Sequence, residues 1–470
     1  MSEQSGRDVV APSIDDPWVR VGNEVVGGPL GQHAAPGRSW WTPLRVMLVL
    51  VTLTFGLGMV QKAPCMLGEA SYDRLCYSDI DKLYASRGFA EGQVPFLDDS
   101  GRYPYFEYPV LTGGLVYGAT LVTHAVFGAP MVADLPADEV FADPQVASNV
   151  LPFTTVNAVL LFALAVVAVW ALAVAHRRRP WDAALVAASP ALLLAGLINW
   201  DLLAVALVAL ALAAWSRERA LLAGVLVGLG TAAKLYPLFL LGPLLVLCMR
   251  TRRWGAFALA VLGAAGGWLV VNLPVMAANF EGWKSFWSFN SDRGADLGSL
   301  WYAWSLGGHD VSSHTINIVS WVFFGGCCLA VAAIGLLAPR RPRLPQLALL
   351  VVLAFLLVNK VYSPQYVLWL LPLAALARPR WRDLLVWQAC EAVYFVAIWV
   401  YLEGDLDSAT TDGAPTAYIA AILIRVAGEV WFGSLVVRDI FVPWRDPVRA
   451  DGLTDDPAGG VFDGSDVRTR

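Results

Sequence analysis

The sequence predicts an all-α polytopic membrane protein, and three observations support this fold class. Hydrophobic residues make up 57% of the 470 residues and charged residues only 15%, whereas soluble proteins carry about 25% charged residues. Apolar runs recur along the chain, many of them long enough, or nearly so, to cross about 30 Å of hydrocarbon. The net charge of −5 excludes a nucleic-acid-binding protein of the basic-patch type. Six cysteines are too few for a disulfide scaffold.

The distribution of charge divides the chain into three regions. Residues 1–40 are polar, rich in Gly and Pro and without apolar periodicity, which predicts a disordered cytosolic tail. Residues 41–437 contain the apolar runs and form the predicted transmembrane domain. Residues 438–470 are expected to form a second disordered cytosolic tail. It ends in an acidic stretch with Asp451, Asp455, Asp456, Asp463 and Asp466.

About 12 or 13 membrane segments are predicted between the tails. The first three are long apolar runs, at 44–60, 110–127 and 153–175. The next four are short runs that alternate with polar residues, which is typical of helical hairpins: 183–198, 202–215, 221–233 and 237–248. The remaining segments are expected at 256–275, 316–337, 347–358, 364–376, 384–402 and 417–437.

Clusters of arginine predict the orientation of these segments. The clusters lie at 177–179, 217–219, 250–253, 340–343 and 378–382, and all five can lie in the cytosol, as basic loops of membrane proteins do. Three polar turns, at 199–201, 234–237 and 359–362, then lie on the outer face with the loops 61–109 and 279–313. If 44–60 leaves the cytosol and 153–175 returns to it, the run 110–127 is a re-entrant or half-crossing element. The predicted location is the plasma membrane, with the functional site outside and the tails in the cytosol.

The first outer loop contains the densest polar signal. Asp79 and Asp81 follow the first span closely and are accompanied by Lys82 and Arg87. Acids beside hydrocarbon are candidates for function, and a partly desolvated carboxylate can act as a general base near neutral pH. A solvated acidic loop with one helix cap is the alternative. Glu107 precedes a proline that can open the next helix, so it is either a third site acid or a capping residue.

The polar turns offer cations and further polar groups. Lys234 and Lys360 each end a short apolar run and precede a tyrosine and a proline. Each lysine can extend to the membrane interface, or together with Arg293 they can form an anion site for a phosphate. Asn199 and Asp201 are interpreted as a hairpin cap or as sugar contacts.

The second outer loop is rich in Trp and Phe. Aromatic faces with interleaved acids suit sugar rings, which makes Asp296 and Trp301 candidates for sugar or acceptor binding. An interfacial aromatic belt accounts for the tryptophans equally well. Cys65 and Cys76 share the first outer loop and can form a disulfide there. No group of Cys and His has the spacing of a metal site.

Two stretches resemble a known enzyme. Residues 77–81 (Tyr-Ser-Asp-Ile-Asp), with 92–96 and 103–111, resemble the lumenal DxD loop of the catalytic subunit of GPI mannosyltransferase 1. Residues 359–372 (Asn-Lys-Val-Tyr-Ser-Pro-Gln and onward) are similar to a second signature of that enzyme. From about residue 44 to 437, the chain resembles bacterial glycosyltransferase family 87, including the turns at 199–201, 234–237 and 293–296.

This resemblance implies a GT-C-type transmembrane bundle with a catalytic first outer loop. It implies inverting transfer of a sugar from a polyprenyl phosphate to an envelope glycolipid or glycan, with mannose as the expected sugar and arabinofuranose as the alternative. Asp79 would be the base, supported by Asp81 and Glu107. Lys234, Lys360, Tyr362 and Gln365 would surround the lipid phosphate. Tyr236 is predicted to belong to the same donor-binding site.

Cations can stabilise a departing phosphate without a metal, so no metal is expected to be obligatory, although the DxD pair leaves a divalent ion open. The expected binding partners are the lipid-linked donor, the acceptor and the lipid bilayer, and no nucleic acid. A flippase for lipid-linked sugars or a secondary transporter is the alternative function. The charged groups of transporters lie in the middle of the membrane, often in inverted repeats, whereas here they cluster on one face and no repeat is apparent.

Overall fold

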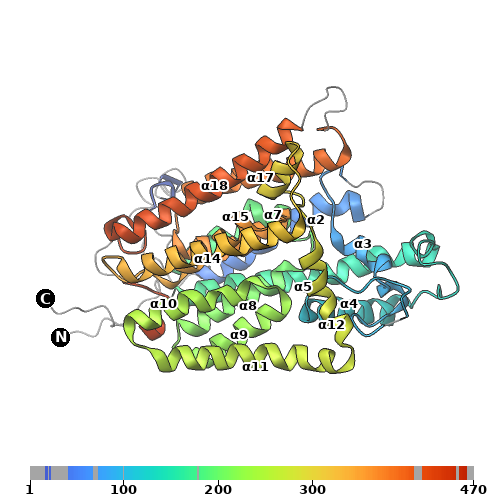
Figure 1. Cartoon of the computed structure of the whole chain (residues 1–470), viewed down its shortest axis with the longest axis horizontal. Coiled ribbons are helices and arrows are strands. Elements are labelled where there is room, and N and C mark those ends of the chain that lie inside the picture. Colours follow the sequence, from blue (N-terminus) through green and yellow to red (C-terminus); the bar gives the residue numbers. More distant parts are fainter. Residues whose placement is uncertain are drawn as a thin grey trace.

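The described parts of the chain form an all-helical bundle whose long helices run side by side along the long axis of the molecule (Figure 1). The computed structural model describes residues 16–19, 21–22, 41–66, 72–98, 100–176, 179–406, 415–450 and 455–462. No strand occurs in these ranges. The predicted tail positions outside them, together with Arg177, Arg178, Asp451, Asp463 and Asp466, lie outside the described residues.

Within the described ranges, seven helices are long and apolar enough to cross a membrane. They are α2 (Pro43–Met66), α4 (Val110–Phe127), α5 (Pro144–Ala175), α11 (Trp254–Ala278), α14 (Ser313–Leu337), α17 (Trp381–Glu403) and α18 (Thr416–Phe441). The predicted fold class, an all-α polytopic membrane protein, is thereby confirmed. The run 110–127 forms one continuous helix of 18 residues, about 27 Å long at 1.5 Å per residue.

Shorter elements complete the bundle. The short apolar helices are α8 (Asp201–Trp215), α9 (Ala220–Ala233), η4 (Tyr236–Leu240) with α10 (Leu241–Thr251), α15 (Leu344–Val358), and η5 (Pro364–Tyr366) with α16 (Val367–Ala377). The remaining elements are α3 (Asp79–Ser86), η1 (Phe89–Glu91), η2 (Val140–Ala142), η3 (Pro180–Ala183), α6 (Ala184–Ala187), α7 (Pro190–Ala195), α12 (Phe280–Asp292), α13 (Leu300–Leu306), η6 (Pro443–Arg445) and η7 (Gly460–Phe462).

The bounds of two predicted segments differ from those of the observed helices, and both segments contain prolines at or near the points of difference. The run 183–198 is not one helix but the end of η3 followed by α6 and α7, since Ser189 and Pro190 end one helix and begin the next. Conversely, α5 begins nine residues before the predicted start at Phe153 and continues through Pro152. The Asp143 carboxylate accepts hydrogen bonds from the first backbone amides of α5, which stabilises this early start.

The short helices form the centre of the bundle and the long ones form its periphery. All residues of α16 are buried, as expected for a helix that is apolar on every side. By contrast, α11 and α14 have exposed apolar side chains, including Val270 (74% exposed) and Leu337 (78% exposed). Such surfaces are unfavourable in water and match a lipid environment.

Glycines allow the closest helix contact, between α9 and α11. A Cβ added to Gly228 would lie 2.1 Å from the backbone oxygen of Ala264, and one added to Gly224 would lie 2.1 Å from that of Ala260. Spaced small residues of this kind let the backbones of membrane helices approach each other directly. The contact fixes the position of α9, whose C-terminal end leads into Lys234.

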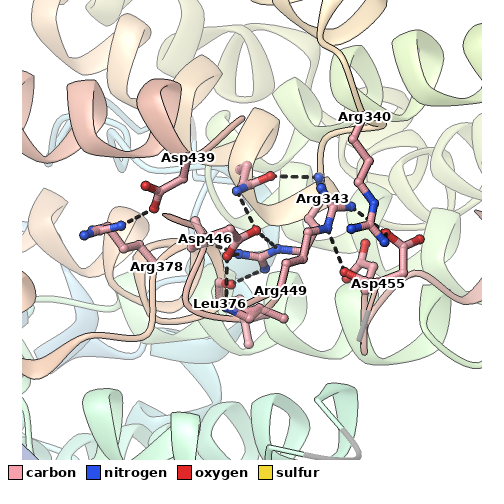
Figure 2. Close-up of polar contacts among 12 residues, drawn as sticks. Arg340, Arg343, Leu376, Arg378, Asp439, Asp446, Arg449 and Asp455 are labelled. Carbon is pink, nitrogen blue, oxygen red and sulfur yellow. Dashed lines mark hydrogen bonds and ion pairs between the residues drawn. The ribbon is translucent and has the colours of Figure 1, made fainter. Parts of the chain in front are cut away.

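Part of the predicted C-terminal tail is folded rather than disordered, which corrects the boundary expected at residue 437. After α18, the chain packs back against the end of the bundle, and the Asp446 carboxylate accepts hydrogen bonds from Arg343 Nε and Nη2 at 2.8 and 2.9 Å (Figure 2). Asp455 pairs with Arg340, Arg341 and Arg449. These acids fold onto the bundle because buried arginines need counterions.

We expect Asp446→Asn to lower the free energy of unfolding by about 3–5 kcal/mol, the cost of leaving one member of a buried ion pair unpaired. Arg343 and Asp446 are both fully buried. Thermal unfolding in detergent, measured against Glu218→Gln, tests this. Glu218 is an exposed acid in the turn between α8 and α9, so its substitution should leave the unfolding temperature unchanged. Equal unfolding temperatures for the two variants would contradict the expectation.

Candidate active site

The loop at residues 61–109 is attached by hydrogen bonds to the polar turn that precedes α8. The backbone amide of Asp79 donates a hydrogen bond to the Ile198 carbonyl oxygen at 2.8 Å. The Ser78 hydroxyl donates to the Leu197 carbonyl oxygen at 2.8 Å and caps the N-terminus of α3. Cys65 and Cys76 form a disulfide that ties the same loop to the end of α2. Asp79 is therefore held from both sides.

Three side chains donate hydrogen bonds to the Asp79 carboxylate. The Tyr77 hydroxyl lies 3.0 Å from Oδ1, the Tyr108 hydroxyl lies 3.1 Å from Oδ2, and Asn199 Nδ2 lies 3.4 Å from Oδ2. Burial raises the pKa of Asp79 above its ordinary value, and these hydrogen bonds offset part of the rise. The carboxylate is thus oriented and partly desolvated, as a general base requires.

Asp79 faces a cavity of about 620 Å³. The cavity is bounded by the loops at residues 61–109 and 279–313 and by the turns before α8, η4 and η5. Eight of the predicted site residues line it: Asp79, Glu107, Asn199, Lys234, Arg293, Asp296, Lys360 and Gln365. The structure thus brings together side chains that are almost 300 positions apart in the sequence.

One wall of the cavity is apolar. Trp321 and Phe324 of α14 and Phe355 of α15 line it, together with Val358. The Trp321 side chain is also among the exposed apolar groups of the bundle surface. The cavity therefore combines a polar region at Asp79 with an apolar region next to a lipid-facing helix.

Asp81 does not line the cavity, in contrast to the expectation that it supports Asp79. It is buried, and its carboxylate lies 4.0 Å from the Lys82 ammonium. Burial raises the pKa of Asp81 to about 6. The two acids diverge because positions i and i+2 of a helix point about 200° apart.

Glu107 lines the cavity but is already paired. Its two carboxylate oxygens accept hydrogen bonds from Arg87 Nε and Nη2 at 2.7 and 2.8 Å. Such a bidentate pair holds both partners in a fixed geometry. Glu107 therefore bridges α3 to the residues before α4, and Pro109 caps α4 as expected.

Lys234 lies beside Tyr108, one of the residues that hydrogen-bond to Asp79. Its ammonium lies 3.4 Å from Oδ1 of Asp201 and 4.8 Å from the centre of the Tyr108 ring. The same Asp201 oxygen accepts a hydrogen bond from the Trp369 indole at 2.6 Å. Asp201 is itself fully buried and outside the cavity lining, so it positions Lys234 rather than contacting a ligand.

Two further cations, Arg293 and Lys360, line the cavity. Arg293 pairs with Asp296 at 2.5 Å, and Lys360 Nζ donates to the Asn317 side-chain oxygen at 2.6 Å. The Asp296 amide donates to the Lys360 carbonyl oxygen at 2.8 Å, which joins the loop at residues 279–313 to the turn before η5. Burial and the nearby Arg293 lower the pKa of Lys360. Both cations face the cavity while held by polar neighbours.

Besides Asp81 and Asp201, three predicted site residues lie outside the cavity lining and have structural contacts instead. Tyr362 is buried, donates to Glu391 at 3.0 Å and lies under the Arg425 guanidinium at 3.6 Å. Tyr236 stacks on Trp369 with ring centres 4.6 Å apart. Trp301 donates to the Val358 carbonyl oxygen at 3.1 Å. The sequence pattern alone did not separate these three side chains from ligand contacts.

Two tyrosines belong to the site although the sequence pattern did not predict them. Tyr77 and Tyr108 both line the cavity and both hydrogen-bond to Asp79. Their only signal was adjacency, since each lies within two positions of a candidate acid. Within the described ranges, no group of three or more His, Cys, Asp or Glu side chains could hold a metal ion.

Part of the chain is similar to a known protein family. The model of glycosyltransferase family 87 matches residues 141–359, which confirms the predicted family resemblance over that part of the chain. The matched segment includes Asn199, Lys234 and Arg293 but ends before Lys360 and begins after Asp79. A search of curated proteins found no match.

Among solved structures, the chain is similar to ArnT from Cupriavidus metallidurans bound to undecaprenyl phosphate. The alignment covers 87% of this chain and 79% of ArnT, at 13% identity and a TM-score of 0.43.

Proposed function

We propose that the protein is a membrane glycosyltransferase that uses a polyprenyl-phosphate sugar as donor. The observation that carries the proposal is the cavity itself, in which one oriented carboxylate, three cations and an apolar wall converge. The match to glycosyltransferase family 87 supports the reaction class. The apolar wall beside α14 suits a polyprenyl chain, and the cations suit its phosphate.

In the proposed reaction, Asp79 takes the proton of an acceptor hydroxyl as its oxygen attacks the anomeric carbon. The bond from that carbon to the phosphate oxygen breaks, and the lipid phosphate leaves with the bonding electrons. Attack from the face opposite the leaving group inverts the anomeric centre. Lys234, Arg293 and Lys360 line the cavity and would stabilise the charge on the departing phosphate.

We also propose the sugar, the acceptor and the location of this reaction. Mannose is the proposed sugar, with an envelope glycolipid or glycan as acceptor and the extracytoplasmic face of the plasma membrane as the location. The five basic clusters would then lie in the cytosol. The cavity lies at the end of the bundle that carries α3, α4 and α12 (Figure 1), which would be the outer end.

A transfer assay tests this function directly. Purified protein in liposomes is given radiolabelled polyprenyl-phosphate mannose and a crude envelope fraction, and new glycosidic products are separated and counted. We expect label in the acceptor fraction. Movement of the labelled sugar across the bilayer without a new glycosidic bond would instead identify a flippase of lipid-linked sugars.

We propose that the transfer needs no metal ion. Asp79 and Asp81, the two acids of the DxD sequence, do not face the same space, so they do not form a chelating pair. Activity is therefore expected to persist in the presence of a chelator. Loss of activity that one divalent ion restores would overturn this part of the proposal.

The pH profile is expected to report the hydrogen bonds to Asp79. A base must be deprotonated, so the rate rises with pH until it passes the raised pKa of Asp79. Asn199→Ala removes a donor that favours the charged carboxylate, which raises that pKa further and moves the acid limb of log kcat/KM to higher pH. Asn290→Ala is the matched control, because Asn290 lines the cavity but donates to Phe286 instead. Equal acid limbs for the two variants would contradict the role of Asn199.

A further inference from the structure

A second cavity, of about 430 Å³, lies where α16 meets α17 and where α18 ends. Arg378, Arg380 and Arg382 line it from the turn between α16 and α17. Arg438 of α18 and Arg445 of η6 line the other side. The hairpin of α16 and α17 connects the two cavities. Residues at the start of η5 and the end of α17 line the first cavity, and the turn between α16 and α17 lines the second, so the two cavities lie at opposite ends of the bundle.

Acids compensate only part of the positive charge of this arginine cleft. Asp383 and Asp439 lie behind its wall and pair with Arg378, which is buried between them (Figure 2 shows the pair with Asp439). Arg382 shares Asp383, and Arg438 shares Asp439. These two carboxylates therefore balance only two of three arginines.

The other two arginines of the cleft have no carboxylate partner in the described parts of the chain. Neither Arg380 nor Arg445 forms an ion pair there, and the only acid that lines the cleft is Asp16. The Asp16 carboxylate accepts hydrogen bonds from the backbone amides of Trp18 and Trp381. About two positive charges remain uncompensated in a concave site, and such a site attracts an anion.

The rim of the arginine cleft has the composition of a membrane interface. Trp444 and Trp18 line the cleft and are 75% and 53% exposed. Tryptophan is enriched where lipid headgroups meet hydrocarbon, and basic pockets between membrane helices bind anionic headgroups. A guanidinium binds a phosphate through paired hydrogen bonds, and five guanidinium groups surround this space.

We propose that the arginine cleft binds the phosphate-bearing headgroup of an anionic membrane lipid, at the face of the bundle opposite the candidate active site. The site is independent of the proposed transferase activity. Its bound lipid would join the α16–α17 turn to the end of α18 and so act on the stability of the folded bundle. The polyprenyl donor is not its ligand, since the two cavities share no residue.

Native mass spectrometry of the purified full chain tests the proposal, with phosphatidylglycerol as the probe and phosphatidylcholine as the neutral comparison. We expect wild type to retain phosphatidylglycerol selectively. The double variant Arg380→Gln, Arg445→Gln should weaken that binding by roughly tenfold or more, since both side chains near the phosphate contribute. The matched control is Arg217→Gln, Arg219→Gln, which removes two exposed arginines from the turn between α8 and α9 and should bind as wild type.

A second measurement applies if the cleft variant folds poorly. Phosphatidylglycerol should raise the unfolding temperature of wild type, because a ligand that binds the folded state stabilises it, and phosphatidylcholine should not. Excess inorganic phosphate should not replace the lipid effect; if it displaces phosphatidylglycerol completely, the ligand is a soluble anion and the lipid assignment fails. Equal retention of both lipids, or equal loss of binding in cleft and control variants, would also overturn the proposal.

Discussion

Replacing Asp79 with Asn is expected to reduce sugar transfer by about 10²–10⁴-fold, the contribution of a positioned general base. The change keeps the size of the side chain and leaves an oxygen that accepts the hydrogen bond from Tyr77. The fold should therefore persist while the proton acceptor is lost. Initial rates in the liposome assay, at saturating donor and acceptor, measure this effect as a fall in kcat.

Asp73→Asn provides the matched control. Asp73 belongs to the same loop, is exposed and does not line the cavity, so its amide variant should transfer sugar at the wild-type rate. Unfolding temperatures of both variants confirm that they are folded. An Asp79→Asn protein with full activity would exclude Asp79 as the base. That result would not by itself contradict the proposed transferase activity.

Lys234→Gln is expected to lower transfer by about 10²–10³-fold if the ammonium stabilises the departing phosphate. The same change leaves the buried Asp201 carboxylate without its cation, which costs roughly 3–5 kcal/mol of stability. A loss of activity in the single variant therefore combines two effects. The expected results are a low kcat and a lower unfolding temperature.

The double variant Lys234→Gln, Asp201→Asn separates these effects. It removes both charges of the pair, so the unfolding temperature should recover most of its loss. Activity should stay low if Lys234 acts on the phosphate, and recovery of activity would show that Lys234 is only structural. Lys284→Gln is the control for loss of one lysine, because Lys284 on α12 is exposed and outside the cavity.

The sequence was sufficient to predict the class of fold and the convergence of distant polar turns. Apolar runs and basic clusters determined which turns share a face, and this grouping placed Asn199, Lys234 and Lys360 together. The direction of each side chain was not predictable in the same way. Asp81 is two positions from Asp79, yet the helical geometry of α3 turns it away from the cavity.

The C-terminal region shows a second reason why sequence reasoning was incomplete. The acidic composition after residue 437 is typical of a solvated tail. However, Arg343 is buried among α15 and α16 and its carboxylate partner is 103 positions away along the chain. The composition of the C-terminal region gives no sign that a buried arginine so far upstream needs one of its carboxylates as a counterion. The burial of Tyr362 was unpredictable for a related reason, since its partners Glu391 and Arg425 are also remote in the sequence.

The ion pairs that join the C-terminal region to the bundle also determine the order in which the protein can be completed during synthesis. Arg341 and Arg343 leave the ribosome more than a hundred residues before Asp446 and Asp455 do. Until those acids emerge, this end of the bundle contains cations without counterions, and burying them is unfavourable. It follows that the turn before α15 reaches its final packing only after translation has passed residue 455. A nascent chain stalled earlier would hold that turn in an unfinished state, whereas the polar end around Asp79 and Lys234 could already be assembled.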